Sequence, residues 1–379
     1  MSKWQILAQP FFCDPKFIYI FAWQTDIPMQ TELEKLIDLY RNLGVDQQID
    51  YDKFYLYSII THSTAIEGST ITELENQIMF DQGISLKGKN IDEQNMNLDL
   101  KAAYEQTIQL AKSHTPITID ILKELSALVM KNTGKEYKTA LGDFSSAKGE
   151  LRLLNVTAGI GGKSYMSYNK IPTKLAEFCN NLNEERKNHT IKSITQLYEL
   201  SFDAHYNLVT IHPWADGNGR MARLLMNLLQ FEFGLIPTKI LKEDKEEYIK
   251  ALVATRENED LNIFRKFMTS LMIRNLTHDI ETYRKTLEED LKSREKITKS
   301  REKITKSREK ITKSREKIIA LLSNDNTLTM AAIARQIGIT QKAVEKQIAR
   351  LKADGIIKRI GPDKGGHWLV IKDSKNHLQ

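Results

Sequence analysis

The stretch His-Pro-Trp-Ala-Asp-Gly-Asn-Gly-Arg-Met-Ala-Arg at residues 212–223 decides the interpretation of this 379-residue chain. Apolar residues at three- and four-residue steps run up to Ile211, and a second helical pattern follows the stretch. We therefore expect a loop between two helices, in which Gly217 and Gly219 let the backbone approach a ligand closely. Free N–H groups and the positive end of the helix dipole favour phosphate at such a place.

The same loop contains the side chains that phosphoryl or nucleotidyl transfer requires. His212 can act as a general base near neutral pH, and Asp216 offers a hard oxygen ligand for Mg²⁺. Arg220 and Arg223 lie three residues apart, where both can clamp phosphate oxygens. The alternative is a capped turn between helices with incidental charges, but the complete set of residues favours a reaction.

These residues resemble the signature of the Fic domain family, roughly HPFx(D/E)GNGRxxR. The chain departs from it at Trp214, where the family usually has Phe. This exchange of one aromatic residue for another concerns the local packing of the loop more than its chemistry. Gly219 stands where the related Doc branch has lysine, so the resemblance is to the nucleotidyl-transferring branch. The matching positions are His212, Pro213, Asp216, Gly217, Asn218, Gly219, Arg220 and Arg223.

The resemblance implies a protein adenylyltransferase, which transfers AMP from Mg-ATP to a Tyr, Ser or Thr hydroxyl of a target protein and releases pyrophosphate. It implies that His212 is the base and that Asp216 holds Mg²⁺. Tyr248 resembles an aromatic residue of the family's adenine pocket, with core packing as the alternative. The implied ATP-binding set, in which the Asn218 side chain and the loop backbone hold phosphate oxygens, is Gly217, Asn218, Gly219, Arg220, Arg223 and Tyr248.

A second motif lies upstream, where Ser63-x-x-x-Glu67-Gly68 resembles the family's inhibitory motif, (S/T)xxxE(G/N). Ser63 and Glu67 are one turn apart on a helix that Gly68 ends. A carboxylate at a helix C-terminus faces an unfavourable dipole and seeks a cation. The resemblance implies that this cation is Arg223, so that Glu67 occupies the γ-phosphate clamp. The alternative is an ordinary surface glutamate near a helix end.

Residues 151–168 combine two short apolar runs with several glycines, which predicts a β-hairpin. This hairpin occupies the position of the family's flap, which docks an extended target segment by strand addition. The alternative is a plain surface hairpin, because the proline-rich run common after the flap is missing. The docking candidates are Gly161, Gly162, Lys163, Ser164 and Tyr165.

Residues 316–372 show three helical segments followed by two apolar runs, an order that resembles a winged helix-turn-helix domain. Gly338 turns the chain and Thr340 can cap the third helix. DNA binding is one interpretation, and protein contacts or dimerisation are the alternatives. The DNA-binding candidates are Gln341, Lys342, Glu345, Lys346 and Arg350 on the third helix, with Arg359 and Lys364 in the wing.

Three identical SREKITK heptads fill residues 293–313. One apolar residue in seven is too few for a coiled-coil seam, so we expect a solvated helical spacer. The net charge is +6 in these heptads, +6 over 317–379 and −6 over 1–292. A basic tail on an acidic body indicates a polyanionic partner, or else a basic helix that binds nothing.

The remaining composition indicates a cytoplasmic protein. The chain has only two cysteines, Cys13 and Cys179, which argues against a disulfide framework. We find no signal peptide and no apolar run long enough for a membrane span.

We therefore expect a mainly α-helical protein with a small β-hairpin flap. The expected parts are an N-terminal helical region with the inhibitory motif (1–115), a Fic core (116–275), a helical linker (276–315) and a winged helix-turn-helix domain (316–379). The leading function is autoinhibited adenylylation of a target protein, and self-modification and a homodimer remain open. The alternative is a DNA-binding regulator whose Fic domain is a weakly active or ligand-sensing platform.

Overall fold

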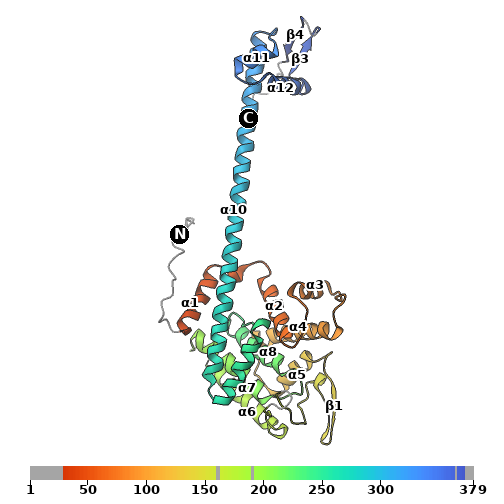
Figure 1. Cartoon of the computed structure of the whole chain (residues 1–379), viewed down its shortest axis with the longest axis vertical. Coiled ribbons are helices and arrows are strands. Elements are labelled where there is room, and N and C mark those ends of the chain that lie inside the picture. Colours follow the sequence, from red (N-terminus) through yellow and green to blue (C-terminus); the bar gives the residue numbers. More distant parts are fainter. Residues whose placement is uncertain (1–28, 159–162, 189–191, 363–364, 372–379) are drawn as a thin grey trace, which may run out of the picture. The chain divides into compact units, whose positions relative to one another are not determined.

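The computed structural model describes residues 29–158, 163–188, 192–362 and 365–371. The expected mainly helical fold is confirmed: the described residues form long helices and two small antiparallel sheets (Figure 1). The chain divides into two compact units, Met1–Tyr283 and Arg284–Gln379. Helix α10 (Leu261–Asn324) continues through the boundaries predicted after residues 275 and 315.

The first unit consists mainly of helices. Their bounds are α1 Met29–Asn42, α2 Tyr51–Ile66, α3 Glu73–Gln82, α4 Ile91–Lys112, α5 Ile119–Val129, α6 Ile171–Lys187, α7 Ile194–Ile211, α8 Asn218–Glu232 and α9 Lys245–Asn258, followed by the first part of α10.

Helix α8 is the centre of this unit and packs against α4, α5 and α7 (Figure 1). Every residue from Arg220 to Gln230 on α8 is buried, so this helix has no solvent face over most of its length. Helix α7 begins with a capping box between Ser193 and Gln196, which satisfies two backbone N–H groups at its start. The loop of residues 212–217 is thus fixed between two well-anchored helices.

Two hydrophobic clusters hold the unit together. One joins α4, α5, α6, α7 and α8 and includes Trp214 of the loop. The other joins α1, the opposite face of α7, Met226 of α8, α9 and the start of α10, which contributes Phe264. Because α7 and α8 contribute to both clusters, the loop that connects them is tied to almost the whole unit.

One β-hairpin was not anticipated from the sequence: β1 (Glu136–Thr139) pairs antiparallel with β2 (Gly142–Ser145). In the hairpin expected at 151–168, fewer residues pair across the two sides than predicted. Thr157 bridges Ser164, and the backbone hydrogen bonds from Ala158 to Lys163 (3.1 Å) and from Tyr165 to Val156 (3.0 Å) flank that bridge. Its tip, including the docking candidates Gly161 and Gly162, lies outside the described residues.

The second unit contains the end of α10, α11 (Met330–Ile337), α12 (Gln341–Ala353) and the hairpin β3 (Ile357–Ile360) with β4 (His367–Val370). This order of three helices and a two-stranded wing is the expected winged helix-turn-helix. Thr340 caps α12 by accepting a hydrogen bond from the Ala343 N–H, as predicted. Its core consists of Ile318, Leu322, Ile333, Ala334, Val344, Ile348, Leu351, Ile357 and Trp368.

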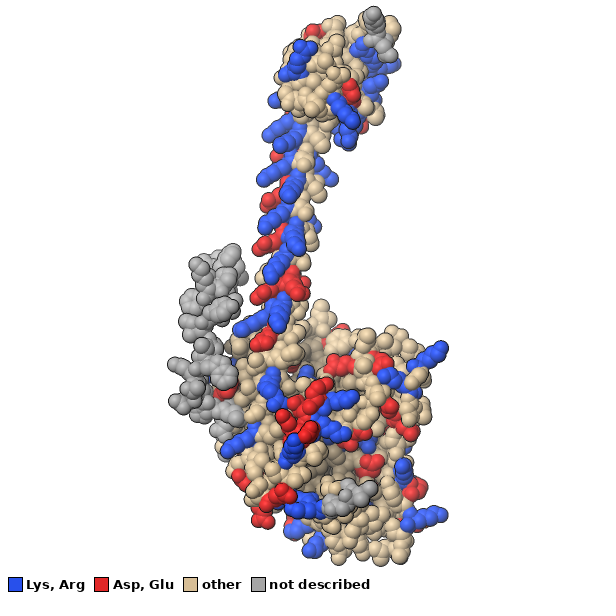
Figure 2. Space-filling model, viewed as in Figure 1, with Lys and Arg blue, Asp and Glu red and all other residues tan. Residues whose placement is uncertain are grey.

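Figure 2 shows lysine and arginine side chains interspersed with acidic ones along the heptad segment, and several lysine and arginine side chains on the visible face of the second unit. The heptad isoleucines Ile297, Ile304 and Ile311 are exposed on α10, in agreement with a solvated spacer. Among the described residues, no helix combines the length and apolarity needed to cross a membrane.

Candidate active site

The loop between α7 and α8 is held in a defined shape by its own side chains. His212 ends α7 in a left-handed conformation (φ 53°), and Gly217 opens α8 at φ 80°. A Cβ atom at Gly217 would lie 2.8 Å from the sulfur of Met130, so only glycine fits there. The Asn218 side chain accepts from the Trp214 N–H (3.1 Å) and donates to the Trp214 carbonyl (2.8 Å), which closes the loop.

This closure engages the Asn218 side chain, whose amide oxygen and nitrogen both bond the backbone of residue 214. Its contact with a phosphate oxygen stays a prediction from the resemblance. Trp214, the departure from the family pattern, is fully buried, and its indole N–H donates to the Gly149 carbonyl (3.0 Å). The larger ring is therefore accommodated with its polar atom satisfied.

The His212 imidazole is arranged as a base. Its Nδ1 lies 3.2 Å from the Val209 carbonyl, which can only accept, so Nδ1 carries the proton and Nε2 keeps its lone pair. Burial lowers the pKa of His212 to about 4, the charge of Arg152 acts in the same direction, and Val209 and Asp216 oppose the shift. The ring is thus neutral near pH 7.

Tyr165 of the flap covers this imidazole. The two rings stack with their centroids 3.7 Å apart and an interplanar angle of 14°. The Arg256 guanidinium of α9 lies 5.8 Å from the Tyr165 ring centre, and Lys163 contacts Glu257 of the same helix (3.1 Å). Three of the predicted docking residues, Lys163, Ser164 and Tyr165, lie in this side of the hairpin, and Tyr165 contacts His212.

Asp216 is the exposed acid of the loop, with 58% of its side chain accessible. Its Oδ1 accepts from the Gly217 N–H (2.6 Å) and lies 3.8 Å from Arg220. No cluster of three or more His, Cys, Asp or Glu residues that could hold a metal occurs among the described residues. One accessible carboxylate fits Mg²⁺ that arrives with nucleotide phosphates, since this ion is bound through one or two carboxylates and phosphate oxygens.

The two arginines of α8 differ in their surroundings. Arg220 is buried behind the loop, where it contacts the Val129 carbonyl (3.4 Å) and the Met130 sulfur (3.1 Å). Burial lowers its pKa. Arg223 is also buried, but it points to the end of α2, where its Nε donates to Ser63 Oγ (2.8 Å).

Glu67 completes the surroundings of Arg223. Its Oε1 accepts from Arg223 Nη2 at 2.6 Å, and 34% of its side chain remains accessible. Although burial opposes ionisation, Arg223 lowers the pKa of Glu67; Glu67 in turn raises the pKa of Arg223 despite its burial. A Cβ atom at Gly219 would lie 2.8 Å from Glu67 Oε1, so the carboxylate rests against the first turn of α8.

A buried polar network fixes the end of α2 in this position. The Thr64 hydroxyl donates to the side-chain oxygen Oδ1 of Asn97 (2.8 Å), and the side-chain Nδ2 of Asn97 donates to Ser69 Oγ (3.1 Å). Asn76 of α3 donates to the same Asn97 oxygen (2.8 Å). Gly68 follows Glu67 at the end of α2, and its N–H donates to the Ala65 carbonyl (3.1 Å). Glu67 is thus held by its backbone as well as by its charge.

Tyr248, for which the sequence left an adenine-pocket role and core packing open, is buried. It is 1% exposed, belongs to the cluster around Phe264, and its hydroxyl lies 2.9 Å from His205 Nε2. Burial raises its pKa, against the effect of Arg223. Tyr248 thus packs in the core next to Arg223, and its place in an adenine pocket stays a prediction.

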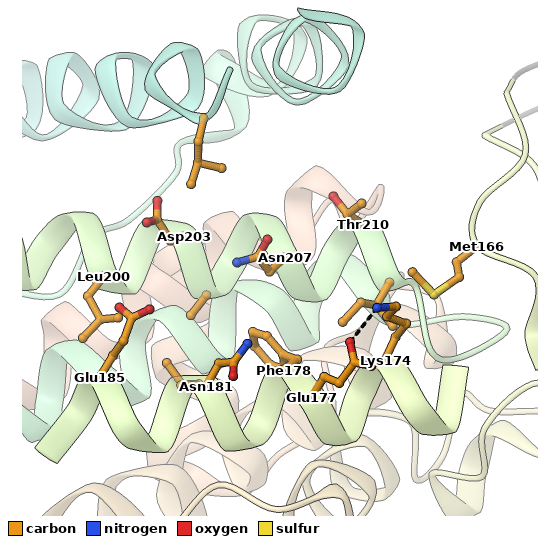
Figure 3. A pocket seen from close by; sticks show the side chains of 14 residues that line it. Met166, Lys174, Glu177, Phe178, Asn181, Glu185, Leu200, Asp203, Asn207 and Thr210 are labelled. Atoms are coloured by element: carbon orange, nitrogen blue, oxygen red, sulfur yellow. Dashed lines mark hydrogen bonds and ion pairs between the residues drawn. The ribbon is translucent and has the colours of Figure 1, made fainter. Parts of the chain in front are cut away.

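A pocket of about 470 Å³ opens between α6 and α7 (Figure 3). Carboxylates line it, but Glu177 contacts Lys174 and Asp203 contacts Arg265. His212 and the two arginines of α8 do not line this pocket. It is therefore separate from the candidate phosphate site.

The DNA-binding candidates of the third helix share one exposed side of α12. Gln341, Lys342, Lys346 and Arg350 are exposed, whereas Val344 and Ile348 face the core. Glu345 lies on the same side and accepts from Gln341 (3.0 Å). In the wing, the Arg359 guanidinium lies 4.8 Å from the Trp368 ring centre, and Lys364 is outside the described residues. The exposed side is basic, as recognition of a polyanion requires.

Sequence reasoning missed Arg152. It is 1% exposed and its Nε donates to the His212 carbonyl (2.8 Å). An isolated arginine after a loop has no periodic or motif signal, because its contacts are to backbone groups distant in sequence. The sequence indicated only that Arg152 lies in an apolar run at the start of the predicted hairpin.

Comparison with known families gives two matches. Residues 116–230 match the Fic/DOC family, and residues 311–358 match the winged helix-turn-helix DNA-binding family. The first match contains the His212 loop and most of α8, and the second contains α11 and α12.

A curated relative is the Protein adenylyltransferase fic-1 of Caenorhabditis elegans, 30% identical over 203 residues. The alignment covers 53% of this chain and 36% of the relative, so the chain spans about a third of that protein's length. The solved structure of Fic-1 from C. elegans is similar with a TM-score of 0.54 at 24% identity, over 68% of this chain and 72% of that chain.

A Fic family protein from Desulfovibrio desulfuricans is similar over 93% of this chain and 98% of its own, with a TM-score of 0.53 at 17% identity. At these identities, the similarity of the two solved structures concerns the fold.

Proposed function

Because the chain carries a Fic domain and a winged helix-turn-helix domain, we propose that it is an autoinhibited protein adenylyltransferase. The substrates are Mg-ATP and a hydroxyl side chain of a target protein, and the products are the AMP-modified protein and pyrophosphate. One observation carries this proposal: a neutral His212 stands at the start of a phosphate-binding loop whose Arg223 already holds a carboxylate.

His212 acts as the general base in this proposal. Its free Nε2 takes the proton of the target hydroxyl, while the oxygen forms a bond to the α-phosphorus of ATP. The bond from the α-phosphorus to the bridging oxygen breaks, and pyrophosphate leaves with the electron pair. The hydrogen bond from Nδ1 to Val209 keeps the ring in the tautomer that this step requires.

The loop and the start of α8 hold the phosphates. Backbone N–H groups at Gly217 to Gly219 and the helix dipole favour the anion, and Arg223 neutralises its distal charge. Asp216 is the residue that would hold Mg²⁺, which neutralises charge on the phosphate oxygens when it is bound. Arg220 supports the loop from behind, where it contacts Val129 and Met130.

Glu67 is the brake. Its carboxylate accepts from Arg223 and lies against the N-terminal turn of α8, so it takes the place of an anionic phosphate group. ATP cannot use Arg223 until Glu67 leaves, and without this contact its α-phosphate is not aligned for attack. Inhibition in this proposal is therefore a competition between two anions for one cation.

Label transfer from α-phosphate-labelled ATP tests the proposal, with host lysate as the source of targets. We expect strong labelling by Glu67→Gly, weak labelling by the wild type, and none by Glu67→Gly combined with His212→Ala. Silence of the single variant with α-label, γ-label and other nucleotides would refute the proposal. Labelling of the protein itself would identify self-modification.

A second function, duplex DNA binding by residues 316–379, is favoured by the exposed basic side of α12. We expect salt-sensitive binding, because each neutralised phosphate releases counterions. Absence of binding at low salt would rule it out. A dimer and a cytoplasmic location stay predictions from the sequence.

A further inference from the structure

Arg152 is a buried cation that the proposed reaction does not use. It is 1% exposed, and its acceptors are backbone carbonyls of three segments. Its Nε donates to His212 (2.8 Å), Nη1 to Leu154 (2.6 Å) and Nη2 to Met166 (2.5 Å). Its own N–H donates to the Pro213 carbonyl (3.1 Å). Burial lowers its pKa, so the site must be built well enough to keep a charge that burial disfavours.

The three acceptors join the flap to the catalytic loop. Leu154 precedes the first paired segment of the flap, and Met166 follows the second. One guanidinium therefore fixes both ends of the hairpin against the backbone of His212. Tyr165, next to Met166, is thereby placed over the imidazole at a ring distance of 3.7 Å.

The ion pair of the flap with α9 is weaker. Lys163 contacts Glu257 of α9, but both side chains are half or more exposed, and surface pairs of this kind contribute about 0–1 kcal/mol. A buried guanidinium with three acceptors in a rigid fork is the more stable connection. Arg152 is thus the main element that sets the distance between flap and base.

We propose that Arg152 is a positioning residue that fixes the flap over His212 and so presents the target hydroxyl to Nε2. The inference rests on the proposed function, because it assumes that the flap docks the target. A planar fork reaches all three carbonyls together, whereas a lysine ammonium reaches fewer of them. The fixed positive charge also favours the neutral, basic form of His212.

Few groups face His212, so the effect of Arg152 on the His212 pKa can be measured. Arg152 and Asp216 are the charged residues that act on it, the Val209 carbonyl holds Nδ1, and the uncharged Tyr165 ring covers its face. Removal of the Arg152 charge should raise the pKa of His212, and removal of its fork should loosen the flap. The two effects can be separated by two substitutions.

The test uses the full chain with Arg152→Lys, Arg152→Met and, as control, Arg186→Met. Arg186 is another buried arginine, which pairs with Glu232 (2.8 Å), outside the candidate site. The pKa of His212 is measured by NMR titration without nucleotide, with His212→Asn to assign the signal. Label transfer is measured in the Glu67→Gly background, and circular dichroism checks folding.

For Arg152→Met, we expect a rise in the His212 pKa of about one unit. Label transfer should fall roughly 100-fold, the cost of a misplacement of about 1 Å. Arg152→Lys should keep the pKa near the native value and still lose roughly tenfold or more of the label transfer. Arg186→Met should change neither quantity, although it loses stability.

Full label transfer by Arg152→Lys would overturn the positioning role, as would equal losses in Arg186→Met. If Arg152→Met does not fold, Arg152→Lys decides alone, because it keeps the charge and removes only the fork. If Glu67→Gly itself transfers no label, the proposed function fails. The Arg152 role is then judged by the Tyr165–His212 ring contact, which Arg152→Lys should abolish in NMR spectra and Arg186→Met should keep.

Discussion

The two ends of the stretch at residues 212–223, a loop followed by the first turns of α8, differ in their contacts. At the first end, His212 is neutral, its Nδ1 is bound to Val209, and its Nε2 is available. At the other end, Arg223 donates to the hydroxyl and the carbonyl of Ser63 and to the carboxylate of Glu67. In the proposed reaction, the base is therefore ready, whereas the cation that would bind the distal phosphate already holds a carboxylate.

This difference indicates that, in the proposed function, inhibition acts at Arg223 and not at His212. A carboxylate that replaces a phosphate leaves the catalytic geometry intact and needs only to be displaced, so release does not require the base to be rebuilt. The polar network around Asn97 holds Glu67 in place from the side of α2, away from His212.

The largest effect is expected at the ready end. In the Glu67→Gly background, His212→Ala should lower label transfer roughly 1000-fold, within the usual range for a general base. Rates from α-labelled Mg-ATP measure this, with unchanged circular dichroism as control. Label transfer that stays within tenfold would mean that another group takes the proton.

The occupied end should give the next effect. Glu67→Gly should raise label transfer roughly 100-fold, the usual worth of one preorganised donor. Glu67→Gln should give an intermediate rate, since it keeps the shape and loses the charge that holds Arg223. Equal rates for wild type and both variants would show that Glu67 does not limit the reaction.

The pH dependence sharpens the contrast. His212 must be neutral to accept a proton, and its pKa is lowered to about 4. The kcat/KM of Glu67→Gly should therefore be flat from about pH 8 to about pH 5.5 and fall only near pH 4. A fall centred near pH 6.5, with the fold intact, would show an imidazole with an ordinary pKa.

Trp214→Phe should affect stability more than activity. The substitution removes the donor to the buried Gly149 carbonyl, which costs about 1–3 kcal/mol of unfolding free energy. Because Asn218 bonds only the backbone of residue 214, the loop shape and the label transfer should change little. Chemical denaturation measures the first effect, and a tenfold loss of label transfer would contradict the second.

The smallest effect is expected from the repeats. Deletion of residues 300–306, one SREKITK copy, should leave label transfer unchanged, because the heptads are solvated and seven residues turn a helix by nearly two full turns. Loss of folding or of catalysis would contradict their role as a spacer.

The helices around the loop could be predicted from the sequence because their signals are local. Apolar spacing defines α7 and α8, and glycines mark the turn between them. The ion pair of Glu67 with Arg223 lies where the family resemblance implied it. These features depend on short motifs, which one sequence displays.

The missed features depend on contacts distant in sequence. The β1–β2 hairpin turns at Ala140 and Leu141, which are not typical hairpin-turn residues, and it is supported by stacking of Tyr137 on Phe144. Arg152 gains its role only when Leu154, Met166 and His212 come together. Tyr248 could not be assigned from the sequence because a buried aromatic and a pocket aromatic have the same spacing.

A double-mutant cycle on Glu67 and Arg223 tests whether Glu67 inhibits the enzyme by occupying Arg223. Label transfer is measured for the wild type, Glu67→Gly, Arg223→Ala and the double variant at equal Mg-ATP. If Glu67 inhibits by occupying Arg223, Glu67→Gly activates only when Arg223 is present, and both Arg223→Ala chains stay nearly silent. Equal activation by Glu67→Gly with and without Arg223 would show that Glu67 does not inhibit through Arg223.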